Sequence, residues 1–186
     1  MGHFQLIGRA LGRSGRASRA LGRVLIILSP LLLAGCRSPD PKAVLKVTDV
    51  ETYWVLDPSR TDKRYLAPAV RFRVENISSE TFLAVDATAA FKITGNDDPW
   101  GSGFFRLTEG RKNLAPGAKV LVTMSSDARY TIEGDAESAF TNPTFKPVTT
   151  TFFLKVGSSP WVEFGKQPVE NVLGSKDARA VLAQPK

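Results

Sequence analysis

The chain has 186 residues, enough for one main domain, and its 42% hydrophobic and 23% charged residues are close to globular averages. This composition argues against a disordered chain, a collagen-like repeat and a multispan membrane protein. A single cysteine and a single histidine exclude an internal disulfide and a cysteine-rich zinc site.

The first 35 residues have the three-part layout of a secretory signal. Five arginines precede an apolar run over 24–33, and the small residues Ala34 and Gly35 follow that run. The run is about ten residues long and contains Pro30, whereas a membrane-spanning helix needs about 20 apolar residues. We therefore expect a cleaved signal peptide over 1–35 in preference to a retained transmembrane anchor.

The positive charge of the chain lies mostly in this leader. Removing its five arginines lowers the formal net charge from +7 to +2. The repeat Arg-Ala-Leu-Gly-Arg at 9–13 and 19–23 is therefore interpreted as a long export region, not as a stripe that binds nucleic acid or anionic lipid. No nucleic-acid partner is expected.

The signal ends in Leu33-Ala34-Gly35-Cys36, which resembles the lipobox of bacterial lipoproteins. In that family the cysteine thiol is diacylated and the cysteine becomes the new N-terminus. The resemblance implies a lipid on Cys36 that anchors the protein durably in a membrane, because two or more acyl chains suffice for stable anchoring. Arg37 and Ser38 stand where an inner-membrane retention signal would carry Asp, so we expect the outer membrane of a bacterial cell envelope, facing the periplasm. The alternative for Cys36 is an ordinary buried thiol beside a conventional cleavage site.

Apolar and polar residues alternate repeatedly after a tether over 36–43, which contains two prolines. This period-two pattern predicts half-buried strands. The longer runs are 70–75, 83–92, 119–125 and 148–156, with shorter ones at 104–107 and 161–164. The opening strand, 44–55, changes phase near Thr48-Asp49, which predicts a β-bulge or a strand that passes between two sheets.

These strands predict an all-β fold, an immunoglobulin-like antiparallel β-sandwich of about seven strands over 44–173. A C-terminal tail is expected over 174–186. Helical periodicity is poor, and only 136–140 and 176–183 fit short helices.

Three segments resemble the immunoglobulin-like domains of the FxLYD type found in bacterial extracytoplasmic proteins. They are the turn Asn76-Ile77-Ser78, the alternating strand 82–93, and the turn Leu114-Ala115-Pro116-Gly117 before the strand 119–125. In that family the first turn links two strands and the second starts a later one. The aromatic-Asp signature is absent, since 91–95 reads Phe-Lys-Ile-Thr-Gly. The resemblance implies a binding or assembly module without a catalytic site.

The loop 94–103 is the best candidate for a ligand site. Asn96, Asp97 and Asp98 offer hard oxygen ligands to Ca²⁺, and Trp100 offers a ring that stacks on a sugar or peptide. The alternative is an ordinary strand connection, because Gly, Asn, Asp and Pro favour turns for local backbone reasons. A second acidic segment, 133–137, supplies further ligands only if it lies beside this loop. The residues alone assign no metal, and no cofactor is expected.

The long connection 126–147 carries Tyr130, Phe140 and Phe145 with little periodicity. Connections of this length commonly have a function, so the segment is a candidate partner surface. Its aromatic residues are equally suited to pack inward over an open sheet edge. The sequence leaves both interpretations open.

The function expected first is a membrane-anchored, non-catalytic protein-interaction or scaffold module of a cell-envelope assembly. The alternative is a module that binds carbohydrate, cell-wall fragments or calcium through 94–103. With His3 in the cleaved leader and Cys36 acylated, nucleophilic triads and dyads that use these residues are excluded. The scattered carboxylates do not suggest a hydrolase, so no enzyme activity is expected.

Overall fold

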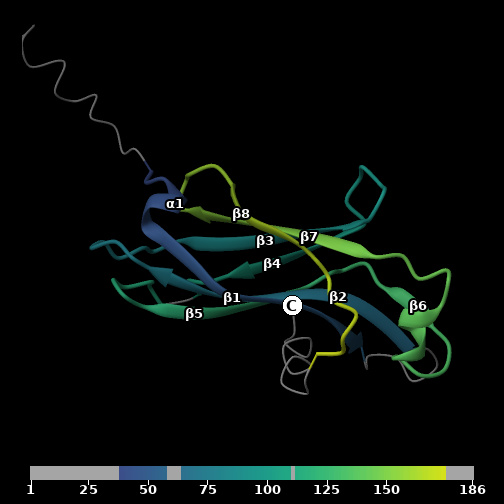
Figure 1. The fold of residues 1–186 in the computed structure, drawn as a ribbon. Helices are drawn as coiled ribbons and strands as arrows, with labels where there is room; N and C mark the ends of the chain where they lie inside the picture. Colours follow the sequence, from purple (N-terminus) through teal and green to yellow (C-terminus); the bar gives the residue numbers. More distant parts are fainter. Residues whose placement is uncertain (1–37, 58–63, 110–111, 175–186) are drawn as a thin grey trace, which may run out of the picture. The chain divides into compact units, whose positions relative to one another are not determined.

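The computed structural model describes residues 38–57, 64–109 and 112–174. The expected signal peptide over 1–35, the lipobox-like segment with Cys36 and the helix expected over 176–183 lie outside these residues. The described chain forms two antiparallel sheets that pack face to face (Figure 1). This confirms the expected all-β sandwich, with eight strands in the described part instead of about seven.

Each sheet contains strands that are far apart in the sequence. The first holds β1 (Leu45–Asp57), β2 (Arg64–Asn76) and β5 (Lys119–Ser125) in that order, and β6 (Tyr130–Ile132) also pairs with β2. The second sheet has the order β4-β3-β7-β8, with β3 (Val85–Ile93), β4 (Gly101–Arg106), β7 (Val148–Val156) and β8 (Val162–Pro168). The chain crosses between the sheets after β2, β4 and β6, as in immunoglobulin-like sandwiches.

A β-bulge produces the phase change of the opening strand. The pairing of β1 with β2 shifts register between Thr48 and Glu51. Asp49 adopts a φ of 54°, a left-handed conformation that Asp tolerates better than most residues. Leu45 before the bulge and Trp54 after it therefore both reach the core. The bulge expected near Thr48-Asp49 is confirmed.

The core lies between the two sheets and is built from the alternating positions. Phe72 of β2 stacks on Phe152 of β7, with ring centroids 4.6 Å apart, so the sheets meet through aromatic contact at their centres. Side-chain burial alternates along the whole of β7, as the sequence pattern predicted. Burial of these faces is the main favourable contribution to folding.

Two parts of the sheets have no alternating signal in the sequence. Residues 66–70 of β2 are all buried, so no polar residue marks the outer face there. β6 has only three residues, too few to show a period. These segments form strands because β2 extends past β5 and pairs with β6.

Residues expected in the tether form a short helix, α1 (Pro41–Val44). Asp40 caps the helix by accepting a hydrogen bond from the Lys42 amide at 3.0 Å, and Pro41 occupies the first turn, where its missing N–H costs nothing. Pro41 is buried, so the folded unit begins before Val44. No helix among the described residues is long and apolar enough to cross a bilayer.

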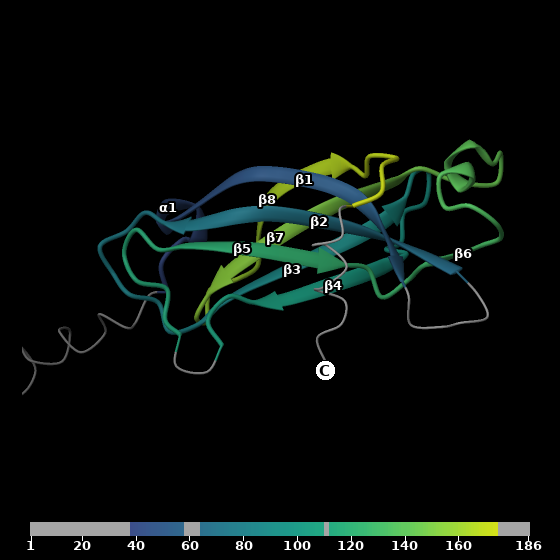
Figure 2. The ribbon, with the colours of Figure 1, turned by 90° about the horizontal axis from the view of Figure 1, so that it is seen from below.

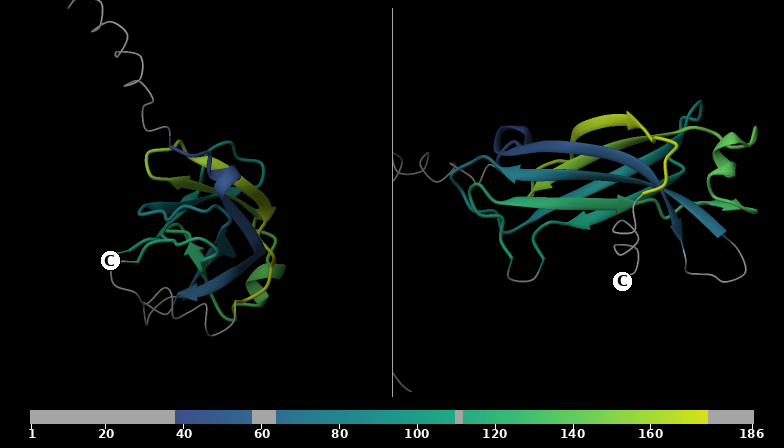
Figure 3. Two further views of the ribbon diagram at one scale, coloured as in Figure 1. Left: turned by 90° about the vertical axis from the view of Figure 1, so that its left-hand side faces the viewer. Right: turned by 60° about the horizontal axis from the view of Figure 1, so that its bottom comes forward.

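The segment after β8 crosses to the other sheet and covers the edge of β1 (Figure 3, yellow). The Thr52 hydroxyl donates to the Pro168 carbonyl at 2.9 Å and accepts from the Glu170 amide at 3.1 Å. The Trp54 amide then donates to Val172, and the Gly174 amide donates to the Trp54 carbonyl, both at 2.8 Å. These bonds join the two sheets along one side.

The two ends of the sandwich carry different elements (Figures 1 and 2). The chain enters the described structure at α1, which lies at one end. β6 and the 3₁₀ helix η2 (Ser138–Thr141) lie at the opposite end, where the loop between β3 and β4 also projects. A short helix was expected over 136–140, and the 3₁₀ helix found there begins two residues later than expected, at Ser138.

Candidate functional site

The loop between β3 and β4 starts as a tight turn. The Asn96 amide donates to the Ile93 carbonyl at 3.0 Å, and Gly95 has a φ of 93°, which favours glycine. Asn96, Asp97 and Asp98 are exposed. The Lys92 ammonium donates to the backbone carbonyl of Asp97 and not to its carboxylate. These contacts satisfy the turn locally.

Trp100, near the end of this loop, packs its ring against the body of the sandwich. Its amide donates to the Phe91 carbonyl at 2.7 Å, which aligns the residue with the start of β4. Its ring lies 4.7 Å from the ring of Tyr130, in the segment that the sequence presented as a second, separate candidate. The structure therefore joins the two candidate segments through Trp100 and Tyr130.

An aromatic cluster fills this end of the sandwich. Its members are Trp54, Trp100, Tyr130, Phe140 and Phe145. Tyr130 and Phe145 are 5.0 Å apart, and the fully buried Trp54 lies 4.9 Å from Phe145. Tilted rings at these separations are the favoured geometry of aromatic pairs. Both interpretations of 126–147 therefore have support, since its aromatic residues pack inward and also border a cleft.

The cleft lies between β6 and the segment around η2 and has a volume of about 360 Å³. Both polar and apolar side chains line it. Its lining residues are Tyr130, Thr131, Ile132, Glu133, Ser138, Ala139, Asn142, Thr144 and Phe145. This volume lies at the lower end of the range for small-molecule sites and also suits one or two side chains of a protein partner.

Local hydrogen bonds hold the outer wall of the cleft. The Ser138 hydroxyl donates to the Asp135 carbonyl at 2.7 Å, and the Asn142 side-chain oxygen accepts from both the amide and the hydroxyl of Thr144. The Tyr130 hydroxyl donates to the Lys146 carbonyl at 3.4 Å, and burial raises the pKa of Tyr130 above its ordinary value. The wall is thus shaped before any ligand arrives.

The acidic side chains do not assemble into a metal site in the described part of the chain. No group of three carboxylate, imidazole or thiol side chains lies close enough there to hold a metal ion. The Asp135 carboxylate instead accepts from the Ser138 amide at the start of η2. Asn96, Asp97 and Asp98 lie exposed in the turn and Trp100 contacts the aromatic cluster, so the calcium interpretation of this loop stays a prediction.

A second groove, of about 240 Å³, lies beside the bulged strand and was not predicted from the sequence. Tyr53, Arg71 and the segment 172–174 are among its lining residues. Arg71 pairs with Glu51 and lies 6.0 Å from the centre of the Tyr53 ring. Burial raises the pKa of Tyr53, and the nearby Arg71 charge partly opposes the shift. The sequence signal was Tyr53 itself, an aromatic residue on the face opposite Trp54.

Comparison with known protein families and with curated proteins found no match. Among solved structures, a structural genomics target is 8% identical over 70% of this chain and 89% of its own, with a TM-score of 0.39. A protein described as ApaA from Bordetella pertussis is 14% identical over 67% of this chain and 91% of its own, with a TM-score of 0.34. A protein from Archaeoglobus fulgidus is 11% identical over 66% of this chain and 95% of its own, with a TM-score of 0.36. These similarities are too low to carry a functional argument.

Proposed function

We propose that this chain is a bacterial lipoprotein, anchored through Cys36, whose β-sandwich is a non-catalytic interaction or scaffold module of a cell-envelope assembly. The contact surface in this proposal is the cleft between β6 and η2. The observation that carries it is that β6 and η2, whose residues line the cleft, lie at the opposite end of the sandwich from α1 (Figures 1 and 2). A module held at the α1 end presents this cleft away from the membrane.

The composition of the cleft also supports a binding role. Tyr130 and Phe145 offer aromatic surface, and the neighbouring side chains offer hydrogen-bond donors and acceptors. Tyrosine and other aromatic residues are enriched where proteins bind one another, because they combine large apolar area with few rotatable bonds. The FxLYD-type resemblance of the turns and strands is part of the same proposal.

The anchor is tested by the variant Cys36→Ala. In cells that process lipoproteins, the unaltered protein is expected in the membrane fraction and in the detergent phase. The variant is expected in the soluble fraction, because it cannot receive the acyl chains. Tight membrane association of Cys36→Ala would contradict the proposed anchor.

The contact surface is tested by photo-crosslinking in intact cells. A photoreactive amino acid at Thr131, an exposed lining residue, is expected to capture one envelope protein identified by mass spectrometry. The same group at Glu163, exposed on β8, serves as the matched control. The product from Thr131 is expected to disappear when Phe145→Ala removes one wall. Equal products from both positions would refute the cleft as the contact surface.

A second candidate function is binding of a carbohydrate or cell-wall fragment in the same cleft. It is favoured by the cleft lining, in which the aromatic rings of Tyr130 and Phe145 lie beside hydroxyl and amide side chains. Because Trp100 contacts Tyr130, a ligand on Tyr130 changes the surroundings of Trp100. Titration with peptidoglycan fragments, followed by tryptophan fluorescence in the unaltered protein and in Trp100→Phe, separates this function from protein binding. An unchanged spectrum and melting temperature at millimolar fragment would dismiss it.

A further inference from the structure

We infer that the α1 end of the sandwich docks on the bilayer surface that holds Cys36, with Ile77, Leu83 and Trp161 inserted into the lipid interface. This inference rests on the lipid anchor proposed above. It adds a fixed orientation, in which the domain lies against the membrane instead of moving freely on a tether.

The connection between the anchor and the folded unit is short. Ser38 is only two residues after Cys36, so the two Cα atoms are at most about 7 Å apart. Ser38 is already part of the fold, since its hydroxyl shares a hydrogen bond of 2.6 Å with the hydroxyl of Ser158. The headgroup region of a bilayer is about 5–8 Å thick on each side. The α1 end is therefore confined to this region.

Exposed apolar side chains gather at this same end. Ile77, Leu83 and Trp161 are 52%, 73% and 41% exposed, and they are three of the six large hydrophobic side chains exposed in the described residues. The Ile77 amide donates to the Val44 carbonyl at the end of α1, which fixes its place beside the entry point of the chain. Exposed apolar residues grouped together mark interaction sites more often than isolated ones do.

The other two residues flank the turn that Ser158 belongs to. Leu83 precedes Ala84, whose carbonyl accepts from the Gly157 amide at 2.8 Å. Trp161 directly follows the turn, and the Lys155 ammonium lies 4.9 Å from the centre of its ring. Tryptophan with a neighbouring lysine is typical of side chains at a membrane interface, where the ring enters the lipid and the ammonium stays hydrated.

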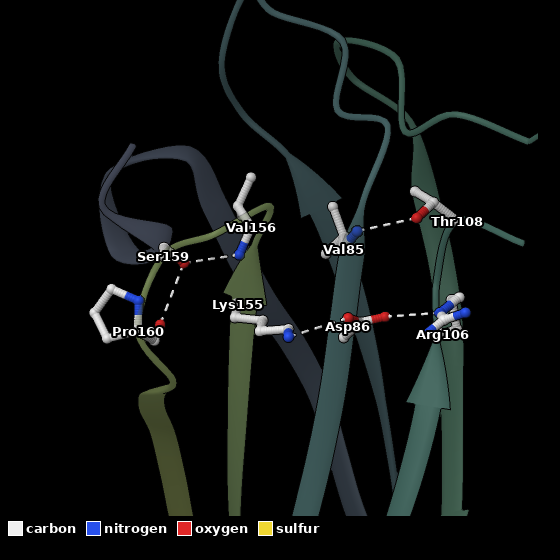
Figure 4. Close-up of polar contacts among 8 residues, drawn as sticks. All are labelled: Val85, Asp86, Arg106, Thr108, Lys155, Val156, Ser159 and Pro160. Carbon is white, nitrogen blue, oxygen red and sulfur yellow. Dashed lines mark hydrogen bonds and ion pairs between the residues drawn. The ribbon is translucent and has the colours of Figure 1, made fainter. Parts of the chain in front are cut away.

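Polar contacts hold these strand ends in one arrangement (Figure 4). The Val156 amide donates to the Ser159 hydroxyl, and the Val85 amide donates to the Thr108 hydroxyl. Arg106 and Lys155 approach the buried carboxylate of Asp86 from its two sides, at 3.1 and 3.6 Å. The apolar residues are therefore carried on fixed turns, so they enter the interface without a further cost of ordering them.

The charges of this end indicate insertion and not electrostatic attraction. The described segments at this end are 38–44, 77–84, 107–109, 112–118 and 155–161. They carry three positive side chains, Lys42, Lys112 and Lys155, and three negative ones, Asp40, Glu80 and Glu109. A balanced surface gains little from anionic lipid, and its binding is only weakly screened by salt. We therefore expect docking on neutral phosphatidylcholine and little change with ionic strength.

The experiment uses the full-length, lipidated protein reconstituted into phosphatidylcholine vesicles. Flotation of the vesicles reports the anchor, and quenching of tryptophan fluorescence by brominated phosphatidylcholine reports contact with lipid. Quenching is expected in the unaltered protein, absent in Trp161→Phe and retained in Trp100→Phe, because Trp100 lies at the other end. Leu83→Glu is expected to reduce quenching at least twofold while flotation persists. Leu121→Glu, an exposed apolar position within β5, is the matched control and is expected to change neither signal.

The outcomes separate this inference from the anchor. Protein that floats with the vesicles but shows no quenching at Trp161 overturns the docked orientation and leaves the anchor standing. Protein that does not float overturns the anchor, and the docking with it. Quenching that collapses when salt is raised, while flotation persists, overturns the insertion of apolar side chains as the cause.

Discussion

The side-chain amide of Asn76 donates a hydrogen bond to the Leu114 carbonyl at 2.9 Å, across 38 residues of sequence. The same amide donates to the Glu80 carbonyl, and its oxygen accepts from the amide and hydroxyl of Ser78. The Gly117 amide in turn donates to the Asn76 carbonyl. Asn76 thus connects the turn after β2 with the turn before β5, the two turns that carry the family resemblance.

Replacing Asn76 by alanine is expected to lower the free energy of unfolding by about 2–4 kcal/mol, because the fully buried Asn76 side chain makes four hydrogen bonds that the variant loses. Urea unfolding of the domain measures the loss. Asn142→Ala is the matched control, since Asn142 accepts the same pair of bonds from Thr144 but is exposed. A loss in Asn76→Ala no larger than in Asn142→Ala would contradict the structural role assigned to Asn76.

Tyr53 is expected to make the folded state sensitive to alkaline pH. Burial raises its pKa from the ordinary value of 10.0, so the unfolded chain loses the phenol proton at a lower pH than the folded one does. Stability is therefore unaffected by this group below about pH 10 and declines as the pH rises through the folded pKa. Urea unfolding at increasing pH is expected to give a smaller decline in Tyr53→Phe. Tyr130→Phe is also expected to reduce the loss of stability at alkaline pH, because burial raises the pKa of Tyr130 as well. An identical decline in both variants and the unaltered protein would argue against these assignments.

Gly103→Ala is expected to destabilise the sandwich by about 1–3 kcal/mol, because an added methyl group overpacks the contact between β4 and β5. A Cβ atom at this position meets the Ser125 carbonyl oxygen at 2.8 Å and the Met124 Cβ at 3.1 Å. Thermal unfolding of the variant measures the effect. Ser102→Ala, exposed on the same strand, is the control and is expected to unfold at the same temperature as the unaltered protein. Equal melting temperatures for the two variants would show that β4 and β5 accommodate the added methyl group with little loss of stability.

Within the loop 94–103, Trp100 is expected to contribute to the stability of the fold, whereas the carboxylates of Asp97 and Asp98 are expected to contribute little. Trp100→Ala removes the ring contact with Tyr130 and is expected to cost about 1–2 kcal/mol. The double variant Asp97→Ala, Asp98→Ala changes exposed side chains and is expected to stay within about 0.5 kcal/mol. Denaturant unfolding with and without Ca²⁺ measures both. Stabilisation by Ca²⁺ that is lost only in the double variant would support the calcium-binding interpretation of this loop.

The strands that the sequence predicts well are those with one face in the core and one in water. β7 was expected over 148–156 and occupies those residues, because each inward Val, Thr, Phe or Leu alternates with a less buried residue. The bulge in β1 was visible for the same reason, since a single change of phase marks where the strand shifts register. Residues 66–70 gave no such signal because both faces are covered there.

The candidate site was predicted in parts and not as a whole. Trp100, Tyr130, Phe140 and Phe145 were each singled out, but their assembly depends on the pairing of β6 with β2, which brings 130–132 beside 64–66. Pairing between segments so far apart leaves no local pattern in the sequence. The cleft and the gathering of Ile77, Leu83 and Trp161 likewise result from the order of strands in the two sheets.

The cover over the edge of β1 has a consequence for self-association. An uncovered edge strand is a template on which a second copy can add its own strand. Here the backbone groups of Trp54 are already bonded to Val172 and Gly174, and the Thr52 hydroxyl holds the covering segment at Pro168 and Glu170. Strand addition along this part of β1 requires that segment to detach first. The covering segment thereby hinders copies of this chain from polymerising through this edge.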